Sequence, residues 1–550
     1  MAKPARDDEL VLLPLGGAGE IGMNFNAYGF GPESDRQWII VDCGVLFGRE
    51  TTSPGVDVIM PDIRYLAEQR ENVLAIVLTH AHEDHIGAIG HLWPMLRCPL
   101  YATPFTARLI EGKLEEAGLR DRVRVKSVPL GGHIEIGPFG IDFVSITHSI
   151  LEPNALAIKT PLGTVVHTGD WKIDPDPLLG EVTDQNALRK LGDEGVLATV
   201  CDSTNALVQG HSGSEARVRQ ALSALIGSLT GRVAVTAFAS NVARLDSVAK
   251  AAREHGRQVA LVGRSMHKMV AAARETGYLG DFPNMIDEAE AAQLPPRRVL
   301  YLCTGSQGEP RAALPRIAAG EHHNVSLGEG DAVIFSSRII PGNELAIFEL
   351  HNKLAALGVE VLTEQDHFVH VSGHPCRDEL AEMYRWTRPR IAVPVHGELR
   401  HMSEHARLAR ALQVPEAVVV ENGHMLRLAP GPATIIDEVP SGRIHLDGRI
   451  LVEEGAGLAR ARRALGNAGM IAITLVLDSK GRVATGPSVI IDGIPEPVHA
   501  AIREAADEAV KRHKKGDEQQ LKENVRRAAR RAASDAWGKK PVTRVEVVWL

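Results

Sequence analysis

The stretch Thr79-His80-Ala81-His82-Glu83-Asp84-His85-Ile86-Gly87 places four potential metal ligands within six residues, directly after the apolar run LAIVL. The apolar run predicts a buried strand, whose end is a rigid base for aiming side chains at one point. His80 and His82 alternate, so a short extended segment puts both on one side, whereas Asp84 and His85 begin the next predicted helix and reach a second point. Imidazole and carboxylate groups without cysteine indicate an open, catalytic zinc-type site rather than a closed structural one.

Two metal ions need more ligands than this loop offers, and three further candidates stand at the ends of predicted strands. His148 ends IDFVSITH, Asp170 ends GTVVHTGD and His396 ends IAVPVHG. Together they would supply the third ligand of one metal, a bridging carboxylate and the third ligand of the other. His167 lies inside the strand before Asp170, and we interpret it as a structural residue, as most single histidines are.

Length and composition bound the kind of protein. The chain has 550 residues, which predicts three or four domains at roughly 150 residues each. Hydrophobic residues make up 44% and charged residues 24% of it, which indicates globular domains and argues against extensive disorder. The net charge of −8 argues against a uniformly basic nucleic-acid-binding surface, although it is compatible with a local basic groove.

The cysteines and the N-terminal residues indicate in which cellular compartment the protein is expected. The five cysteines are far apart and form no Cys-x-x-Cys pair, which predicts free thiols in a reducing environment. The first ten residues, MAKPARDDEL, carry charges of both signs and no apolar core, so no signal peptide is expected. No apolar run approaches the roughly 18 to 20 residues that a membrane helix needs. We therefore expect a cytoplasmic protein.

The chain separates into regions with different patterns. Short strands divided by glycine-rich turns fill the first 200 residues or so, whereas longer strand–helix units follow from about 214 and predict a mostly parallel sheet with covered faces. After about 375 a helix-plus-strand pattern returns. The Gly/Arg-rich stretch EEGAGLARARRALGN at 453–467 is interpreted as a linker to a small unit of strands and two amphipathic helices.

The segment Gly17-Ala18-Gly19-Glu20-Ile21-Gly22 matches the G-x-G-x-x-G motif of dinucleotide-binding folds, and Asp42 lies 20 residues further on. That motif requires a helix to begin at its third glycine. Here MNFNAYGFG follows, which is rich in aromatic and β-favouring residues. A strand-turn-strand is therefore predicted, and the dinucleotide interpretation is rejected.

Further stretches in order along the chain extend the pattern. They are PLGGAGEIGMN at 14–24, THAHEDHIGA at 79–88, GDWKID at 169–174, CDSTNA at 201–206, FASNVAR at 238–244, TGSQGEP at 304–310, SSRIIPGNE at 336–344, HVSGH at 370–374 and PVHGE at 394–398. With the His-x-His-x-Asp-His loop, they resemble the metallo-β-lactamase superfamily, in particular its nucleic-acid-processing β-CASP branch and, within that, the bacterial ribonuclease J family.

The resemblance implies an α/β fold: a metallo-β-lactamase αββα sandwich with an inserted β-CASP α/β domain and a small α+β C-terminal domain. The implied boundaries are 1–205 and 375–452 for the two parts of the sandwich, 206–374 for the β-CASP domain, 453–467 for the linker and 468–550 for the C-terminal domain.

The resemblance also implies the site residues. One metal would be held by His80, His82, His148 and Asp170, and the second by Asp84, His85, Asp170 and His396, with Asp170 bridging. Asp42 would orient the histidine loop from behind. Asp84, Asp202 and His374 would have catalytic roles. The implied nucleotide pocket consists of Phe238, Ala239, Ser240, Asn241, Arg244, His370, Val371, Ser372, Gly373 and His374.

The implied function is metal-dependent cleavage of RNA, with a 5′→3′ exonuclease that favours 5′-monophosphate ends and an endonuclease, in RNA maturation and decay. Two divalent ions, with zinc expected and manganese or magnesium as alternatives, would neutralise phosphate charge and activate a bridging hydroxide for attack on the phosphodiester. His374 would stabilise charge or protonate the leaving 3′ oxygen. The substrate would be single-stranded RNA, and the chain a homodimer or homotetramer.

Alternatives remain open from the sequence. A DNA-directed β-CASP nuclease fits the same ligands, because selection of the 2′-hydroxyl cannot be read from sequence. A small-substrate hydrolase of the lactamase type is disfavoured by the long insert, and a non-catalytic RNA-binding scaffold by the complete ligand set. Residues 499–540 hold 12 Lys and Arg against 7 Asp and Glu, which favours a solvated face over RNA contact or an oligomer interface.

Overall fold

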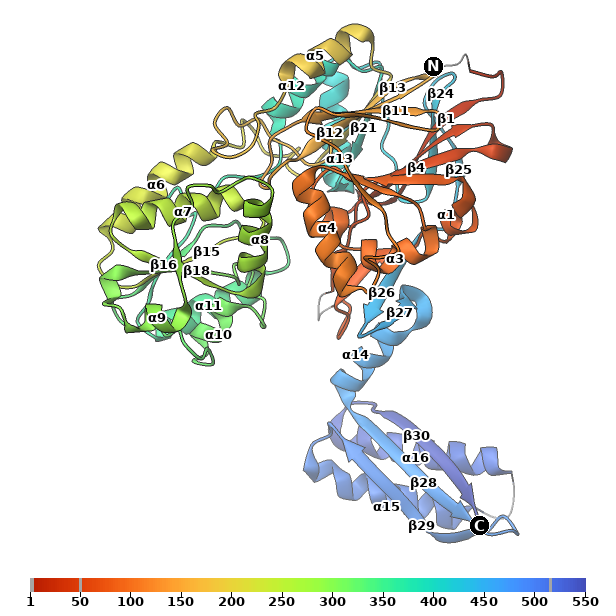
Figure 1. Ribbon diagram of the computed structural model, residues 1–550. Helices are drawn as coiled ribbons and strands as arrows, with labels where there is room; N and C mark the ends of the chain where they lie inside the picture. Colours follow the sequence, from red (N-terminus) through yellow and green to blue (C-terminus); the bar gives the residue numbers. More distant parts are fainter. Residues whose placement is uncertain (1–3, 49–51, 514–516) are drawn as a thin grey trace. The chain divides into compact units, whose positions relative to one another are not determined.

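The computed structural model describes residues 4–48, 52–513 and 517–550. The chain forms two compact units (Figure 1). Met1–Leu46 with Met60–Gly442 make the first, and Phe47–Ile59 with Arg443–Leu550 make the second.

The core of the first unit is a pair of sheets with a shared apolar interior. An eight-stranded sheet has the order β25 (Thr434–Glu438), β24 (His424–Ala429), β1 (Glu9–Gly16), β3 (Phe25–Gly31), β4 (Gln37–Val41), β7 (Val73–Val77), β8 (Leu100–Ala102) and β9 (Val125–Ser127). A seven-stranded sheet has the order β10 (His133–Ile136), β11 (Phe139–Ser145), β12 (Asn154–Thr160), β13 (Gly163–His167), β14 (Ala198–Asp202), β21 (Ile391–Val395) and β23 (Glu416–Ala417). Inward side chains such as Leu12 and Tyr28 from one sheet and Phe143 and Ile158 from the other form one buried cluster.

Helices cover the outer faces of this sandwich (Figure 1). The eight-stranded sheet is covered by α1 (Arg64–Glu68), α3 (Ile89–Leu96) and α4 (Pro104–Glu116). The seven-stranded sheet is covered by α5 (Gln185–Glu194), α12 (Arg377–Thr387) and α13 (Leu399–Ala411). Trp386 and Leu188 from two of these helices pack on the outer side chains of that sheet, such as Val144 and Val166. The predicted αββα sandwich is confirmed.

A parallel sheet with helices on both faces is inserted between β14 and β21, as predicted from the strand–helix alternation. Its order is β17 (Met285–Ile286), β16 (Gln258–Val262), β18 (Val299–Cys303), β15 (Val233–Thr236), β19 (Ala332–Phe335) and β20 (Glu360–Leu362). Its helices are α6 (Glu215–Ser228), α7 (Val242–Glu254), α8 (Arg264–Glu275), α9 (Glu288–Gln293), α10 (Ala313–Ala318) and α11 (Glu344–Ala356). Runs such as VLYLC are fully buried, because helices shield both faces.

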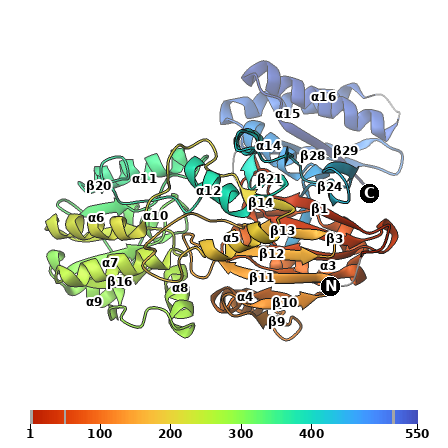
Figure 2. The same cartoon turned by 90° about the horizontal axis from the view of Figure 1, so that it is seen from above.

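The second unit ends in a three-stranded sheet of order β29 (Val483–Asp492), β28 (Met470–Leu477) and β30 (Val542–Trp549). Alternate residues of β28 are fully buried, and α15 (Glu496–Arg512) and α16 (Glu518–Trp537) lie side by side on that face (Figure 2). The basic run on α16 is partly neutralised, because Glu523 pairs with Arg526 and Arg527. Residues 514–516 of the predicted basic stretch lie outside the described residues.

The stretch interpreted as a linker is largely helical. A short hairpin of β26 (Arg443–Asp447) and β27 (Ile450–Glu453) precedes α14 (Leu458–Ala468). Leu, Ala and Arg are strong helix formers, and they outweigh Gly466 inside the helix, whereas two other glycines flank its ends. Gly457 and Gly469 have φ of 80° and 66°, a conformation that glycine adopts without a steric penalty.

The glycine-rich segment, the cysteines and the helices can each be compared with the expectation from the sequence. The segment GAGEIG, all of which the structure describes, lies between the strands β1 and β3 and no helix begins at its third glycine, in agreement with the predicted strand-turn-strand. The five cysteines are free and buried. Among the described residues, no helix combines the length and the apolar character needed to cross a bilayer.

Candidate active site

The histidine loop is fixed by Asp42 at the end of β4. The carboxylate of Asp42 accepts hydrogen bonds from the backbone N–H of Thr79 (2.8 Å) and from its Oγ1 (2.9 Å), and it lies 2.7 Å from Nδ1 of His85. A carboxylate at one ring nitrogen holds the proton there and turns the other nitrogen toward a metal. Nε2 of His85 accordingly faces Asp170. This is the position that the resemblance implied for Asp42.

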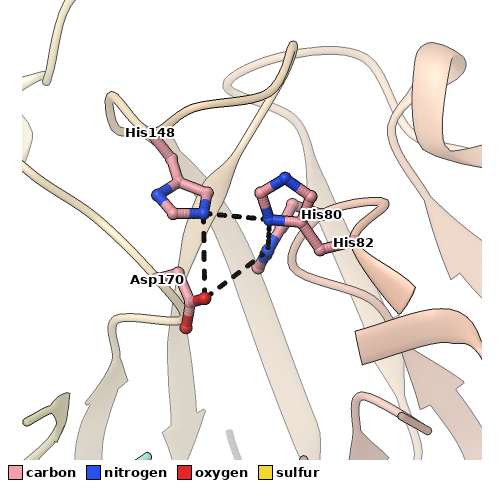
Figure 3. Close-up of side chains that lie close together, drawn as sticks. All are labelled: His80, His82, His148 and Asp170. Atoms are coloured by element: carbon pink, nitrogen blue, oxygen red, sulfur yellow. Dashed lines mark hydrogen bonds and ion pairs between the residues drawn. The ribbon is translucent and has the colours of Figure 1, made fainter. Parts of the chain in front are cut away.

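The first predicted ligand set converges (Figure 3). Nε2 of His80 and Nε2 of His148 lie 3.8 Å and 3.7 Å from Oδ2 of Asp170, and Nε2 of His148 lies 3.0 Å from Nδ1 of His82. The ligand atoms of the four residues lie within 4.8 Å of one another. They come from the loop after β7, the loop after β11 and the loop after β13, which meet at one edge of the sandwich.

The second predicted set converges beside the first and shares one carboxylate with it. Oδ2 of Asp170 lies 3.2 Å from Nε2 of His85 and 3.4 Å from Nε2 of His396. Oδ2 of Asp84 lies 3.6 Å from the same nitrogen of His85. The helix α2 (Glu83–Ile86) carries Asp84 and His85, and His396 follows β21. All seven predicted ligands are therefore brought together around Asp170.

The charge state of this cluster suits metal ions. Burial lowers the pKa of His80 and of His148 well below the usual value, so their rings are neutral and offer lone pairs. Burial alone would raise the pKa of Asp170, but the neighbouring His396, His85 and His374 outweigh it and hold that pKa well below the usual value. Nε2 of His396 and Oδ1 of Asp170 are buried without a hydrogen-bond partner in the described part of the chain. Nitrogen and oxygen donors left unpartnered in this way fit divalent metal ions.

Asn24 is a contact residue that the sequence did not single out. Its Oδ1 lies 3.0 Å from Nδ1 of His396, and its Nδ2 lies 3.0 Å from Nε2 of His85. Asn24 therefore orients two histidines, His85 and His396, that are far apart in the sequence. Its position in the PLGGAGEIGMN stretch indicated that the segment matters to the fold or site. The sequence alone does not indicate which histidine rings an asparagine at this position contacts.

His374 and Asp202 form a hydrogen-bonded pair at the edge of the cluster. Nδ1 of His374 lies 2.8 Å from Oδ2 of Asp202 and 3.8 Å from Oδ2 of Asp170. Burial lowers the pKa of His374, but the carboxylates of Asp202 and Asp170 outweigh it and raise the pKa to about 9. The ring is thus protonated near neutral pH. Its side chain is 24% exposed, whereas Asp202 is buried, so the ring can meet a substrate.

The two segments predicted to form the nucleotide pocket lie against the metal ligands. Oγ of Ser240 lies 3.1 Å from Nε2 of His82, and the carbonyl of Gly373 lies 2.5 Å from Nδ1 of His148. A Cβ at Gly373 would lie 2.8 Å from the ring of His148, so only glycine permits this approach. Nδ1 of His370 is buried without a partner among the described residues. Burial and the charge of Arg244 lower the pKa of His370 to about 3, which leaves the ring neutral.

The other predicted pocket residues have different surroundings. Phe238, Ala239 and Ser372 are half-buried, and Val371 is buried. Asn241 begins α7, where its Oδ1 accepts a hydrogen bond from the backbone of Arg244. The Arg244 side chain is 0% exposed, so it has no surface on which a ligand could rest.

We expect divalent metal to stabilise the folded protein. Metal that binds only the native state raises stability by about 2.7 kcal/mol at a concentration 100 times its Kd. Thermal unfolding should therefore occur at a higher temperature with zinc or manganese than after chelation. His80→Ala, which removes a ligand of the first set alone, is the matched control and should show a smaller shift. An equal shift in both proteins would mean that the metal binds elsewhere.

Comparison with known proteins agrees with this geometry. Residues 27–231 match the metallo-β-lactamase superfamily, 230–354 the ribonuclease J β-CASP domain, 358–419 the Zn-dependent metallo-hydrolase RNA specificity domain and 458–548 the ribonuclease J C-terminal domain. A crystal structure of a protein of unknown function from Enterococcus faecalis V583 superposes with a TM-score of 0.51 at 17% identity, covering 76% of this chain and all of that one. That likeness shows the fold alone.

Three relatives are named ribonuclease J. The Sinorhizobium meliloti protein is 48% identical over 98% of this chain and 97% of its own length. The Mycolicibacterium smegmatis protein is 41% identical over 89% and 87% of the two chains, and the Thermus thermophilus protein 40% identical over 85% and 82%.

The sandwich, its inserted domain and the cluster of histidines and aspartates define the class, which is the β-CASP branch of the metallo-β-lactamase superfamily of metal-dependent hydrolases. Within that class, the chain belongs to the ribonuclease J family. The predictions of the family, of the fold class and of a hydrolase of the ribonuclease type are confirmed.

Proposed function

We propose that this chain is a cytoplasmic ribonuclease that degrades single-stranded RNA 5′→3′ from 5′-monophosphate ends and also cleaves internally, in RNA maturation and decay. The observation that carries the proposal is the position of Ser240 and of the HVSGH loop at 370–374 directly against two ligand sets that share Asp170. A pocket beside the metal site would bind the 5′ end and thereby select the bond to be cut.

The ligands would hold two divalent metal ions, one in each set. Zinc fits nitrogen-rich sets best, and manganese or magnesium are the alternatives. When bound, such ions neutralise phosphate charge and make water a stronger nucleophile near neutral pH. The sharing of Asp170 between the sets supports a pair of ions rather than a single one.

Residues of the chain would transfer the protons and bind the terminal phosphate. Asp84, which is 30% exposed, would accept a proton from the attacking water. His374 would donate a proton to the leaving 3′ oxygen, with Asp202 at its Nδ1 holding the other nitrogen toward the substrate. The Ser240 hydroxyl and the backbone of the HVSGH loop would bind the terminal phosphate by hydrogen bonds. The products would carry a 5′-phosphate and a 3′-hydroxyl.

The proposed domain boundaries follow the predicted ones, at 1–205, 206–374, 375–452, 453–467 and 468–550. We further propose that the protein acts as a homodimer or homotetramer, as the family resemblance implied. Analytical ultracentrifugation of the full chain would test this, and a monomer at micromolar concentration would contradict it.

Cleavage assays on one sequence in several forms test the activity. With divalent metal, 5′-monophosphorylated RNA should be degraded stepwise at least about tenfold faster than the 5′-triphosphorylated or 5′-hydroxyl forms. The reason is that a pocket at a fixed distance from the metal ligands has room for one phosphate and bonds to it, whereas a triphosphate is too long and a hydroxyl is too short. The DNA of the same sequence should be cleaved slowly. Preference for DNA would identify a DNA-directed nuclease instead, and no cleavage of any strand would refute the proposal.

A further inference from the structure

Four charged side chains are buried together next to the candidate active site. They are Lys172, Asp174, Glu215 and Arg244, whose side chains are 1%, 0%, 4% and 0% exposed. Two are positive and two are negative, and they form the pairs Lys172–Asp174 (3.0 Å) and Arg244–Glu215 (2.8 Å). Burying ions is unfavourable unless each is paired and hydrogen-bonded. A set of four therefore fixes the backbone segments that carry them.

One pair lies in the segment that joins two loops of the candidate metal ligands. Lys172 is two residues after Asp170, and its backbone N–H donates to the carbonyl of Thr147 (2.8 Å). Oγ1 of Thr147 donates back to the carbonyl of Lys172 (2.7 Å) and accepts from the backbone of Asp174 (3.1 Å). Because Thr147 directly precedes His148, these bonds of the backbone of residues 172–174 tie two ligand-bearing loops of the sandwich together, and the Lys172–Asp174 ion pair braces that segment.

The second pair holds the pocket segments. The guanidinium of Arg244 binds Glu215 through Nε (3.0 Å) and Nη2 (2.8 Å), and its Nη1 donates to Oγ of Ser336 (2.7 Å) and to the carbonyl of Val369 (3.0 Å). Val369 directly precedes the HVSGH loop. Asn241, which follows Ser240, donates from Nδ2 to Glu215 (3.2 Å). Both predicted pocket segments are therefore attached to this pair.

A backbone hydrogen bond joins the two pairs directly. The backbone N–H of Glu215, at the first residue of α6, donates to Oδ2 of Asp174 (2.9 Å). Lys172 also donates from Nζ to the carbonyl of Gly213 (3.2 Å), in the segment that enters α6. Arg244 and Lys172 together outweigh the effect of burial and lower the pKa of Glu215 to about 2, so this carboxylate stays ionised. The connection runs continuously from the Asp170 loop to the HVSGH loop.

We infer that these four residues, with Ser336, are positioning residues that hold the pocket for the 5′ end at a fixed distance from the metal ligands, and so determine the preference for 5′-monophosphate RNA. The inference rests on the proposed function. Arg244 acts here through Ser336 and Val369, and it touches no substrate because it has no exposed surface. Small displacements between a binding pocket and the reacting groups reduce rates strongly.

The test compares Arg244→Lys and Ser336→Ala with the wild type. Lysine keeps the charge but loses the forked pairing with Glu215, and Ser336→Ala removes one hydroxyl from the same contact. Asp246→Asn is the matched control. The buried Asp246 pairs with Arg219 and Lys250, so it joins α6 to α7 as Glu215–Arg244 does. Within the described part of the chain it makes no hydrogen bond to Val369 or Asp174.

The readout is the ratio of kcat/KM on 5′-monophosphorylated to 5′-hydroxyl RNA, with the cleavage rate of the circular form measured beside it. We expect Arg244→Lys to lower the ratio about tenfold and Ser336→Ala about threefold, with smaller losses on circular RNA, which has no end to bind. The control should keep the wild-type ratio, and metal content should stay equal in all four proteins.

Each other outcome has a defined meaning. If the wild type does not prefer the 5′-monophosphate, the proposed function is wrong. If the wild type shows the preference and both variants keep it, or if all substrates slow equally, the inference is wrong. A loss of the ratio in Asp246→Asn as large as in Arg244→Lys would also overturn it, since the effect would then follow from general destabilisation.

Discussion

Asp170→Ala is expected to abolish RNA cleavage, with a loss of at least about 1,000-fold. Asp170 is the side chain common to both ligand sets, and the four histidines of these sets that contact its Oδ2, together with His374, lie within 3.8 Å of that atom. Its removal takes away the one negative charge that faces both metal positions. Metal ions contribute several kcal/mol of charge stabilisation, and about 1.4 kcal/mol corresponds to each factor of ten in rate.

Metal content measured by mass spectrometry should fall from two ions per chain to less than one in this variant. His80→Ala is the comparison, because His80 belongs to the first set alone. It should also lose cleavage, but it should keep about one ion. Two retained ions in Asp170→Ala would contradict the shared role.

His374→Ala is expected to keep both metal ions while losing about 100- to 10,000-fold in rate, the range typical of a lost general acid. His374 contributes to neither of the two sets around Asp170, although it lies near His396 and Asp202 in a third group of potential ligands. The measurement pairs metal analysis with single-turnover cleavage of 5′-monophosphorylated RNA. Asp202→Asn should lose less, since the imidazole itself remains.

Two results would contradict this role of His374. Full activity in His374→Ala would remove it from the mechanism. Loss of a metal ion together with the rate would make it a ligand instead of a proton donor. A leaving group of lower pKa at the cleaved bond should rescue His374→Ala but not Asp170→Ala, because a good leaving group needs no protonation.

The sequence could predict that the seven candidate ligands converge, because the segments that carry them follow the ends of strands. Strand ends of a sandwich meet at one edge, so His148, Asp170 and His396 converge although they are far apart in the chain. Their residue types and the spacing after LAIVL carried the remaining information. The parallel inserted sheet was predictable for a similar reason, since continuous apolar strands alternating with helices have few other solutions.

What the sequence could not show depends on contacts between distant segments. Asn24 meets His396 across 372 residues, and no local pattern distinguishes it from other polar residues. Arg244 was placed in the pocket by resemblance, yet its burial depends on Glu215 at the start of another helix. The helix α14 was missed because three glycines in a short stretch suggested flexibility, although Gly457 only marks the start of the helix and Gly466 is accommodated within it.

The order of the strands has a consequence during protein synthesis. Parallel pairing joins Ala198–Asp202 of β14 to Ile391–Val395 of β21, and the whole inserted domain is made between them. At 5 to 20 residues per second, about 190 residues take roughly 10 to 40 s. Throughout that interval the nascent chain exposes an unpaired, apolar strand edge, which is the kind of surface that aggregates. Rapid folding of the inserted domain and shielding by chaperones on the ribosome should therefore decide how much active protein a cell obtains.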